Sequence, residues 1–479
     1  MTDILLIQPP VSYTNKIANS GKSDFPIGLV YVGSMLRKHK FSSRILNNSM
    51  GDYSIEDIIN IIESDKIRIL GISALLATIP SAVRLAKAVK NRFGDRVHVM
   101  LGNAHISVDN DIIRRYPYFD SGVQGEADHF IVEHVSRILA GEKRLGIFTA
   151  APPKNLDELP IPMLDMVENM AVFKKNSLVP IVGTRGCPYQ CGYCARPALS
   201  KNVRSRSADS LLAEIESRLH ITDSFYFQDD TATISKTHIT NFCREVIKRK
   251  LKIKFEITTR LDCLTDEIAS LLKQAGCRTL LVGIESGNER IRQEVIQKNL
   301  SDDQIFRGMQ CTKKYNLPVQ LLFMLGHPEE SHKEAMDSVN FPIKLVKMGF
   351  TNIEMVGFHI TFPLPSTRYF DWCLKNEKFS ANIVDDYIDG KLGDGYAGVW
   401  PYLIPNGLTY EDLVDYRKMA TRSFFIRPAY IMKRAIHSIL NPQQLASDIK
   451  NGFYVLTQGS SSDLSKTGKT SSPPAECAS

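Results

Sequence analysis

The sequence lacks the features that mark several large classes of protein. It has no uninterrupted run of some eighteen apolar residues, so we predict no transmembrane helix. The first residues, Met1 to Leu5, include neither a basic segment nor a cleavage site, and no signal peptide is expected. A basic segment interleaved with aromatic residues is also missing, which argues against a nucleic-acid partner.

Cysteine is scarce, and none of the nine cysteines precedes Cys187. Three of them form a C-x3-C-x2-C pattern at Cys187, Cys191 and Cys194, just after a buried strand pattern at 179–182. The other six are scattered and do not indicate a disulfide scaffold: Cys243, Cys263, Cys277, Cys311, Cys373 and Cys477.

The cysteine loop fits two kinds of site. Three thiolates can hold three irons of a [4Fe-4S] cubane and leave one iron open, since such clusters usually take four cysteines. Gly186 and Gly192 would let the backbone wrap tightly around it. The alternative is a zinc knuckle or three unrelated core cysteines. Structural zinc takes four ligands, and no second Cys-x-x-Cys or His-x-x-x-His lies nearby, so the pattern favours the cluster. A cluster with unpaired thiols implies a reducing, cytoplasmic location.

Residues 1–142 alternate strand and helix patterns. This alternation predicts an α/β fold with a parallel, doubly wound (flavodoxin- or Rossmann-like) sheet. Ligands of such sheets bind at the carboxyl ends of the strands, so we expect a site in the loops after Ile7, Ile72 and Leu101. Strands are predicted at 4–7, up to 46, and at 67–73, 97–102 and 120–126, with helices at 27–39 and 81–93.

The remaining chain divides into four parts. A proline-rich linker is predicted at 143–176, a partial (β/α)6 barrel at 177–360, a helical C-terminal cap at 361–458, and a disordered tail at 459–479. The barrel strands are predicted at 179–182, 224–227, 253–258, 279–284, 319–325 and 352–358. Capping boxes open two barrel helices at Ser301 and Ser331, and Thr409 caps a helix of the C-terminal region.

The cysteine loop resembles that of the radical S-adenosylmethionine (SAM) enzymes, in which an aromatic residue precedes the third cysteine, as Tyr193 does here. The later strand ends match the same family in order, although Glu329 stands where a glycine is usual. The resemblance implies a [4Fe-4S] cluster on the three cysteines and an external electron donor of the flavodoxin or ferredoxin type. It also implies SAM contacts from Tyr193, Asp229, Asp230, Arg260, Glu285, Ser286 and Met324.

Alternatives remain for the charged residues. Asp229 and Asp230 offer carboxylates for the SAM ammonium, or one of them caps a helix. Arg260 could pair with the SAM carboxylate through its forked guanidinium, or form a surface salt bridge.

The N-terminal region resembles the cobalamin-binding domain that precedes the barrel in many radical SAM enzymes. The matching segments are 26–29, 71–73, 102–105 and 125–126, but the Asp-x-His-x-x-Gly motif is absent after the first strand. His105 could touch the cofactor or bond only to backbone, and the domain could bind another nucleotide or nothing. The contacts implied are Gln8, Pro9, Gly28, Ser73, Gly102, Asn103, His105, Gly125 and Glu126.

Together these resemblances imply a cobalamin-dependent radical SAM enzyme that methylates an unactivated carbon of a small-molecule substrate, through a 5′-deoxyadenosyl radical and methylcobalamin. Two alternatives are a cobalamin-dependent cyclase or rearrangement enzyme and a cobalamin- or redox-responsive binding protein. The lack of cysteine before Cys187 argues against the tRNA methylthiotransferases, which place cluster cysteines there.

Overall fold

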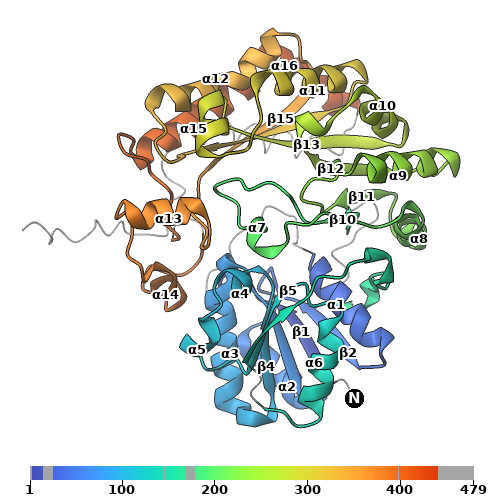
Figure 1. Cartoon of the computed structure of the whole chain (residues 1–479), viewed down its shortest axis with the longest axis vertical. Helices are drawn as coiled ribbons and strands as arrows, with labels where there is room; N and C mark the ends of the chain where they lie inside the picture. The colour runs from blue at the N-terminus through green and yellow to red at the C-terminus, as the bar shows by residue number, and fades with distance from the viewer. Residues whose placement is uncertain (1–2, 14–24, 144–145, 169–177, 397–398, 441–479) are drawn as a thin grey trace, which may run out of the picture.

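The computed structural model describes residues 3–13, 25–143, 146–168, 178–396 and 399–440. Within these ranges the chain forms two large parallel sheets, with the N-terminal sheet at the bottom of Figure 1 and the second sheet above it. The expected α/β fold class is confirmed. The tail predicted at 459–479 lies outside the described residues.

The N-terminal sheet has seven strands in the order β6-β5-β4-β3-β1-β2-β7, and all pairs are parallel. The five strands expected from the sequence are present within one or two residues. The strands are β1 (Ile4–Gln8), β2 (Ser43–Asn47), β3 (Ile69–Ser73), β4 (His98–Gly102), β5 (Ser121–Gly125), β6 (Gly146–Ala150) and β7 (Val167–Glu168).

Helices cover both faces of this sheet, as its sequence pattern requires. Along β1, Ile4 and Leu6 pack with α1 and α6, whereas Leu5 and Ile7 pack with α2 and α3. Because both faces are buried, the strand reads as a continuous apolar run. The helices are α1 (Ile27–Lys38), α2 (Ile55–Asp65), α3 (Ile79–Phe93), α4 (Ala104–Val108), α5 (Ile112–Arg115) and α6 (Phe130–Leu139).

Part of the predicted linker at 143–176 belongs to this sheet, which corrects that expectation. Its described residues supply β6, which pairs with β5, and β7, which pairs with β2. Both are edge strands, and β6 is mostly exposed or half-buried, so it lacks the apolar run that marks the central strands. The chain therefore returns to both edges of the first sheet before it enters the second.

The second sheet is a parallel, open barrel wall in the order β15-β14-β13-β12-β11-β8. The six predicted strands are all present, and each neighbour along the chain is also a neighbour in the sheet. They are β8 (Val179–Ile181), β11 (Ser224–Phe227), β12 (Lys254–Thr259), β13 (Cys277–Glu285), β14 (Val319–Leu325) and β15 (Ile353–Ile360).

Helices pack on the outer face of this sheet, and its inner face is directed toward the N-terminal sheet. The rings of Phe227, Phe242 and Phe255 lie 5.2 to 5.6 Å apart between β11, β12 and α9. Ser301 and Ser331 form the predicted capping boxes. The helices are α8 (Ala208–Arg218), α9 (Lys236–Lys248), α10 (Asp266–Gln274), α11 (Asp302–Lys314) and α12 (His332–Lys347).

The C-terminal helices join both parts of the molecule. The helices α13 (Arg368–Lys375) and α14 (Ile383–Ile388) lie beside the N-terminal domain, where Arg115 pairs with Asp385 at 2.8 Å. The helices α15 (Tyr410–Phe425) and α16 (Pro428–Leu440) belong to the upper part of the molecule, and α15 packs on α12 and β15. Among the described residues, no helix is both long and apolar enough to cross a membrane.

Candidate active site

The cysteine loop follows β8 and is held by backbone hydrogen bonds. Gly192 N–H donates to the Ile296 carbonyl at 2.7 Å, and Cys187 N–H donates to the Ser200 carbonyl at 3.2 Å. Gly186 has φ +94°, and a Cβ there would lie 2.2 Å from the Asn202 carbonyl oxygen. A Cβ at Gly192 would lie 2.8 Å from the Tyr369 ring. Glycine is therefore required at both positions.

The three thiols of this loop are half-buried and free of disulfides. Burial raises the pKa of Cys191, and it raises that of Cys194 to about 11, with a further contribution from the neighbouring thiols in each case. The described residues contain no group of three or more His, Cys, Asp or Glu side chains that fits one metal ion. A cubane places each cysteine on a different iron.

Tyr193 belongs to a buried hydrogen-bonded group at the end of β13. Its hydroxyl donates to Glu285 at 2.9 Å, and the Lys298 ammonium donates to the same carboxylate oxygen at 2.9 Å. Glu285 has φ +70° and is 8% exposed. Ser286 is fully buried and its hydroxyl bonds to Ser338 at 3.1 Å, whereas its predicted contact with SAM stays a prediction.

The two aspartates after β11 have separate roles in the structure. Asp229 is buried and accepts hydrogen bonds from Gly183 N–H at 2.8 Å and from the Thr184 hydroxyl at 2.9 Å. It thereby fixes the segment that leads into the cysteine loop, and burial raises its pKa to about 7. Asp230 instead lines the large cavity and pairs with Arg196 at 2.8 Å.

Arg260 is buried rather than part of a surface salt bridge, and its guanidinium is used within the protein. It donates to both carboxylate oxygens of Asp262, at 3.0 and 2.8 Å, and to the Lys298 carbonyl at 2.9 Å. The guanidinium also lies 3.7 Å from the centre of the Tyr189 ring. In this arrangement Arg260 supports the cysteine loop, and its contact with SAM stays a prediction.

A buried histidine that the sequence did not single out lies behind these groups. His327 follows β14, is fully buried, and bonds through Nδ1 to the Tyr369 hydroxyl at 2.8 Å. Burial lowers its pKa to about 4, so the ring is neutral near pH 7. Met324, near the end of β14 and three residues before His327, is half-buried. The partner of His327, Tyr369, comes from α13, which no local pattern could have revealed.

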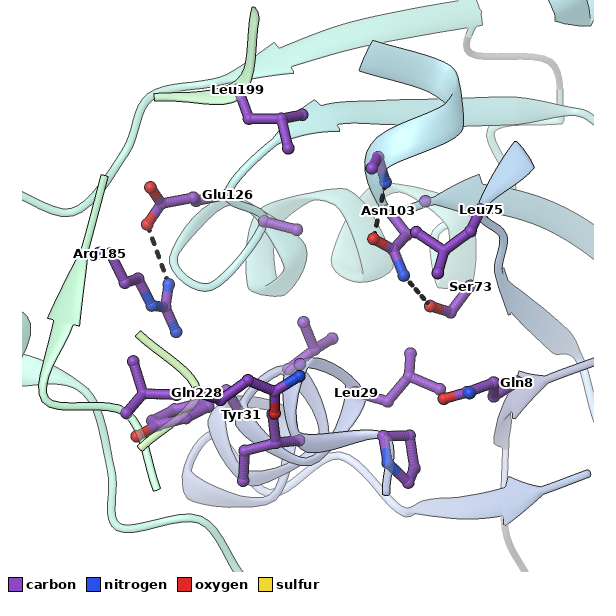
Figure 2. Close-up of a pocket in the computed structure, with 18 of the residues that line it drawn as sticks. Gln8, Leu29, Tyr31, Ser73, Leu75, Asn103, Glu126, Arg185, Leu199 and Gln228 are labelled. Carbon is purple, nitrogen blue, oxygen red and sulfur yellow. Dashed lines mark hydrogen bonds and ion pairs between the residues drawn. The ribbon is translucent and has the colours of Figure 1, made fainter. Parts of the chain in front are cut away.

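A cavity of about 1140 Å³ separates the carboxyl edge of the N-terminal sheet from the inner face of the barrel wall. Figure 2 shows part of its lining, including the Asn103 side chain, which donates to the Ser73 hydroxyl at 2.8 Å. Most predicted cobalamin contacts line this cavity: Gln8, Gly28, Ser73, Gly102, Asn103, Gly125 and Glu126.

The other two predicted cobalamin contacts, Pro9 and His105, are buried and do not line the cavity. His105 is 1% exposed and its Nε2 lies 3.5 Å from Asp109. The described lining residues include no histidine or cysteine. Leu75, which is 46% exposed, lies on the wall of the N-terminal sheet beside Ser73 and Asn103 (Figure 2).

Arginines from the cysteine-loop region join the two halves of the cavity. Arg185 pairs with Glu126 at 2.9 Å and with Asp128 at 2.7 Å, and Arg204 also pairs with Glu126 (Figure 2 shows the first pair). The guanidinium of Arg185 lies 4.9 Å from the Tyr31 ring of α1. Glu126 thus serves as a link between the domains, a role that its sequence context did not reveal.

The cavity suits a large cofactor. Ordinary small-molecule pockets measure about 300–1,000 Å³, so this one is large enough for more than a small substrate. Its lower wall is made of strand ends, glycine, amide and hydroxyl groups with apolar Leu29 and Leu75, which fits a corrin face and its amide side chains. The upper wall carries Tyr226, Glu256 and Gln320 from the barrel strands.

The fold and site define a two-sheet enzyme whose cavity lies between a cofactor-binding sheet and a barrel with a cysteine loop. Comparison with known families agrees: residues 17–135 match a B12 binding domain, and residues 181–341 match the Radical SAM superfamily. The chain is a radical SAM enzyme with a B12 binding domain, as the motifs predicted. These domains imply a [4Fe-4S] cluster, SAM and cobalamin as cofactors.

Similar proteins cover most of the chain. An uncharacterized methyltransferase of Pyrococcus horikoshii is 28% identical over 91% of this chain and 98% of its own length. An anaerobic magnesium-protoporphyrin IX monomethyl ester cyclase of Rubrivivax gelatinosus is 23% identical over 85% of this chain and 74% of its own. The solved structure of the radical SAM methyltransferase TsrM of Kitasatospora setae, with tryptophan and a SAM analogue, has a TM-score of 0.68 at 16% identity and covers 89% of each chain.

Proposed function

We propose that this protein transfers a methyl group to an unactivated carbon of a small-molecule substrate. The observation that supports this proposal most is the shared cavity. The strand ends of the B12 binding domain line it on one side, and the inner face of the radical SAM barrel lines it on the other. The near full-length similarity to an uncharacterized methyltransferase supports methyl transfer. When bound, the cofactors supply the hydrogen-abstracting radical and the methyl donor.

The protein's own contribution is positioning and exclusion of water. Tyr193, Glu285 and Lys298 form a buried, fixed group beside the cysteine loop, and Arg260 holds that loop through Tyr189. A rigid arrangement of this kind keeps reacting atoms at a fixed separation, which is one way a protein lowers the barrier between bound partners. The helix α13 adds Tyr369 to the same group and reaches the N-terminal domain through the neighbouring α14.

The upper wall supports a substrate that carries hydrogen-bond donors. Glu256 and Gln320 line the cavity, and their side chains have no hydrogen-bond partner among the described residues. A half-buried carboxylate without a partner is costly unless a ligand or water pairs with it. A substrate ammonium, hydroxyl or amide group would satisfy it. We therefore expect Glu256→Gln to raise KM about tenfold or more while kcat changes less, and a cofactor-binding measurement should stay unchanged.

The reaction is tested by anaerobic reconstitution with cobalamin, an iron–sulfur cluster, a flavodoxin- or ferredoxin-type reductant and methyl-labelled SAM. Formation of both 5′-deoxyadenosine and S-adenosylhomocysteine, with label in a product, is the expected result. A second candidate is a cyclase, favoured by the similarity to the R. gelatinosus enzyme. That reaction would give 5′-deoxyadenosine without transfer of label, and this outcome would overturn the methylation proposal.

A further inference from the structure

The last described helix exposes an unusual amount of apolar surface. On α16, Ile431, Met432, Ile436 and Ile439 are 51%, 63%, 54% and 76% exposed. Large aliphatic side chains at these exposures form a patch when they are neighbours on one helix, and a patch of this kind marks an interaction site.

Three of these side chains share one stripe. Met432, Ile436 and Ile439 follow the i, i+4, i+7 spacing of one helix face. The opposite face packs on the barrel, where the Tyr430 hydroxyl donates to the Glu354 carbonyl of β15 at 3.2 Å and Ser438 is 7% exposed. The stripe therefore points away from the barrel, and it is not covered by any described part of the chain.

The surrounding segment is basic. Residues 416–440, which span the end of α15 and all of α16, contain no aspartate or glutamate. Lys433, beside the stripe, is 53% exposed at its side chain and lies 3.9 Å from the Glu354 carboxylate of β15. The segment has six cationic residues: Arg417, Lys418, Arg422, Arg427, Lys433 and Arg434. With His437 counted as neutral, the segment therefore carries a net charge of +6 beside the apolar stripe.

We propose that α16 and the end of α15 form a docking surface for an anionic lipid bilayer. An exposed aliphatic stripe flanked by Lys and Arg is the composition of helices that lie in the membrane interface. The aliphatic side chains enter the acyl region, and the cations pair with anionic head groups. The acid-free segment favours this surface over a second copy of the chain, because facing the same basic segment across a symmetric contact would be repulsive.

The position of the surface is compatible with catalysis. The helix α16 lies at the top of Figure 1, and the N-terminal sheet lies at the bottom. The cavity between the two sheets is lined by no residue of α15 or α16. Docking through α16 would thus leave the cavity free, and the proposal is independent of which reaction occurs there.

The test uses the full chain with vesicles of phosphatidylcholine alone and of phosphatidylcholine mixed with phosphatidylglycerol, in a flotation assay. We expect binding only to the mixed vesicles, with binding that falls as salt is added, because head-group attraction is screened. The double variant Ile436→Asp, Ile439→Asp should bind at least about 100-fold more weakly. It removes apolar burial, and its added negative charges are repelled by the anionic lipid.

Leu219→Asp and Leu392→Asp form the matched control, because these leucines are 41% and 37% exposed elsewhere on the molecule. This control should bind as the unaltered chain does, and both variants should keep the same circular dichroism. The proposal is overturned by equal binding to neutral vesicles or by binding that the α16 variant leaves unchanged. It is also overturned if vesicles bind only after residues 441–479 are removed. Self-association that the α16 variant abolishes, without vesicle binding, would assign the face to a second copy instead.

Discussion

Across the cavity, the N-terminal sheet and the barrel present surfaces of different kinds. The sheet offers strand ends and small or uncharged side chains, such as Ser73 and Asn103. On the barrel side, outside the cavity lining, buried charged groups beside the cysteine loop bond to one another, as Glu285 does with Lys298. A surface of the first kind can accommodate a large cofactor by shape, whereas one of the second kind fixes a few atoms in place. The following predictions test this contrast, from the largest expected effect to the smallest.

The strongest test asks whether the barrel binds its iron–sulfur cluster independently of cobalamin binding at the N-terminal sheet. Cys191→Ala removes one cluster ligand, so we expect loss of bound iron and sulfide and no 5′-deoxyadenosine. Cobalamin binding should persist, because its wall lies on the other sheet. Iron analysis and the visible spectrum of the cobalamin-loaded protein measure both at once. Cys243→Ala, a buried cysteine outside the loop, should retain the cluster. Loss of cobalamin in the Cys191 variant would contradict independent loading.

The second test breaks the buried charge pair. Lys298→Met leaves Glu285 buried with only the Tyr193 hydroxyl, and removing one partner of a buried pair costs roughly 3–5 kcal/mol. Chemical denaturation should show a decrease of that size in the free energy of unfolding. Lys418→Met, which removes a surface pair with Asp415, should leave it nearly unchanged. Equal effects of the two variants would mean that the barrel group is not rigidly paired.

The third test uses pH on two glutamates four residues apart. Glu330 is fully buried, and burial raises its pKa from 4.5 to about 8, so the folded state holds its proton more tightly than the unfolded state does. Its contribution to stability is present below pH 4.5 and is lost as the pH rises toward 8. Glu330→Gln should therefore flatten the fall in stability over that range, as measured by thermal unfolding.

Glu334 should behave in the opposite way. Partial burial raises its pKa, but hydrogen bonds from Arg290 and Ser331 outweigh this and bring the pKa down to about 2. Its contribution is present above pH 4.5 and is lost as the pH falls toward 2. Glu334→Gln should thus lower stability at neutral pH and have little effect in acid. If stability changed with pH in the same way in both glutamine variants, the opposite pKa shifts of Glu330 and Glu334 would be refuted.

The smallest effect is expected on the N-terminal wall. Leu75→His places an imidazole where the described cavity lining has none, in a region with room for it. With cobalamin bound, we expect nitrogen hyperfine splitting in the electron paramagnetic resonance spectrum of the cobalt(II) form, with affinity changed only a few-fold. His105→Ala should leave that spectrum as it was, because His105 lies off the cavity. A spectrum altered by the His105 variant would show that the loop moves on binding.

The success of the strand predictions has a local cause. The strands β11 and β14 were predicted to the residue, since a buried parallel strand is a short apolar run between helices. The strands β6 and β7 were missed because edge strands are short and partly exposed. The helix α2 was missed as well, although Ser54 and Asp57 form a capping box at its start.

Some features of this protein are local in the sequence: the cysteine spacing, the order of the strands and the glycines at 186 and 192. The sequence by itself therefore determined the class of enzyme and its cofactors. The partners of Arg260, Ser286, His105 and Glu126 within the protein became visible only in the tertiary structure. Some of these partners lie far along the chain, as when Glu126 forms an ion pair with Arg204 from another domain. Others hold the side chain in a buried position. A motif states which groups are available, and packing decides which of them remain free to bind.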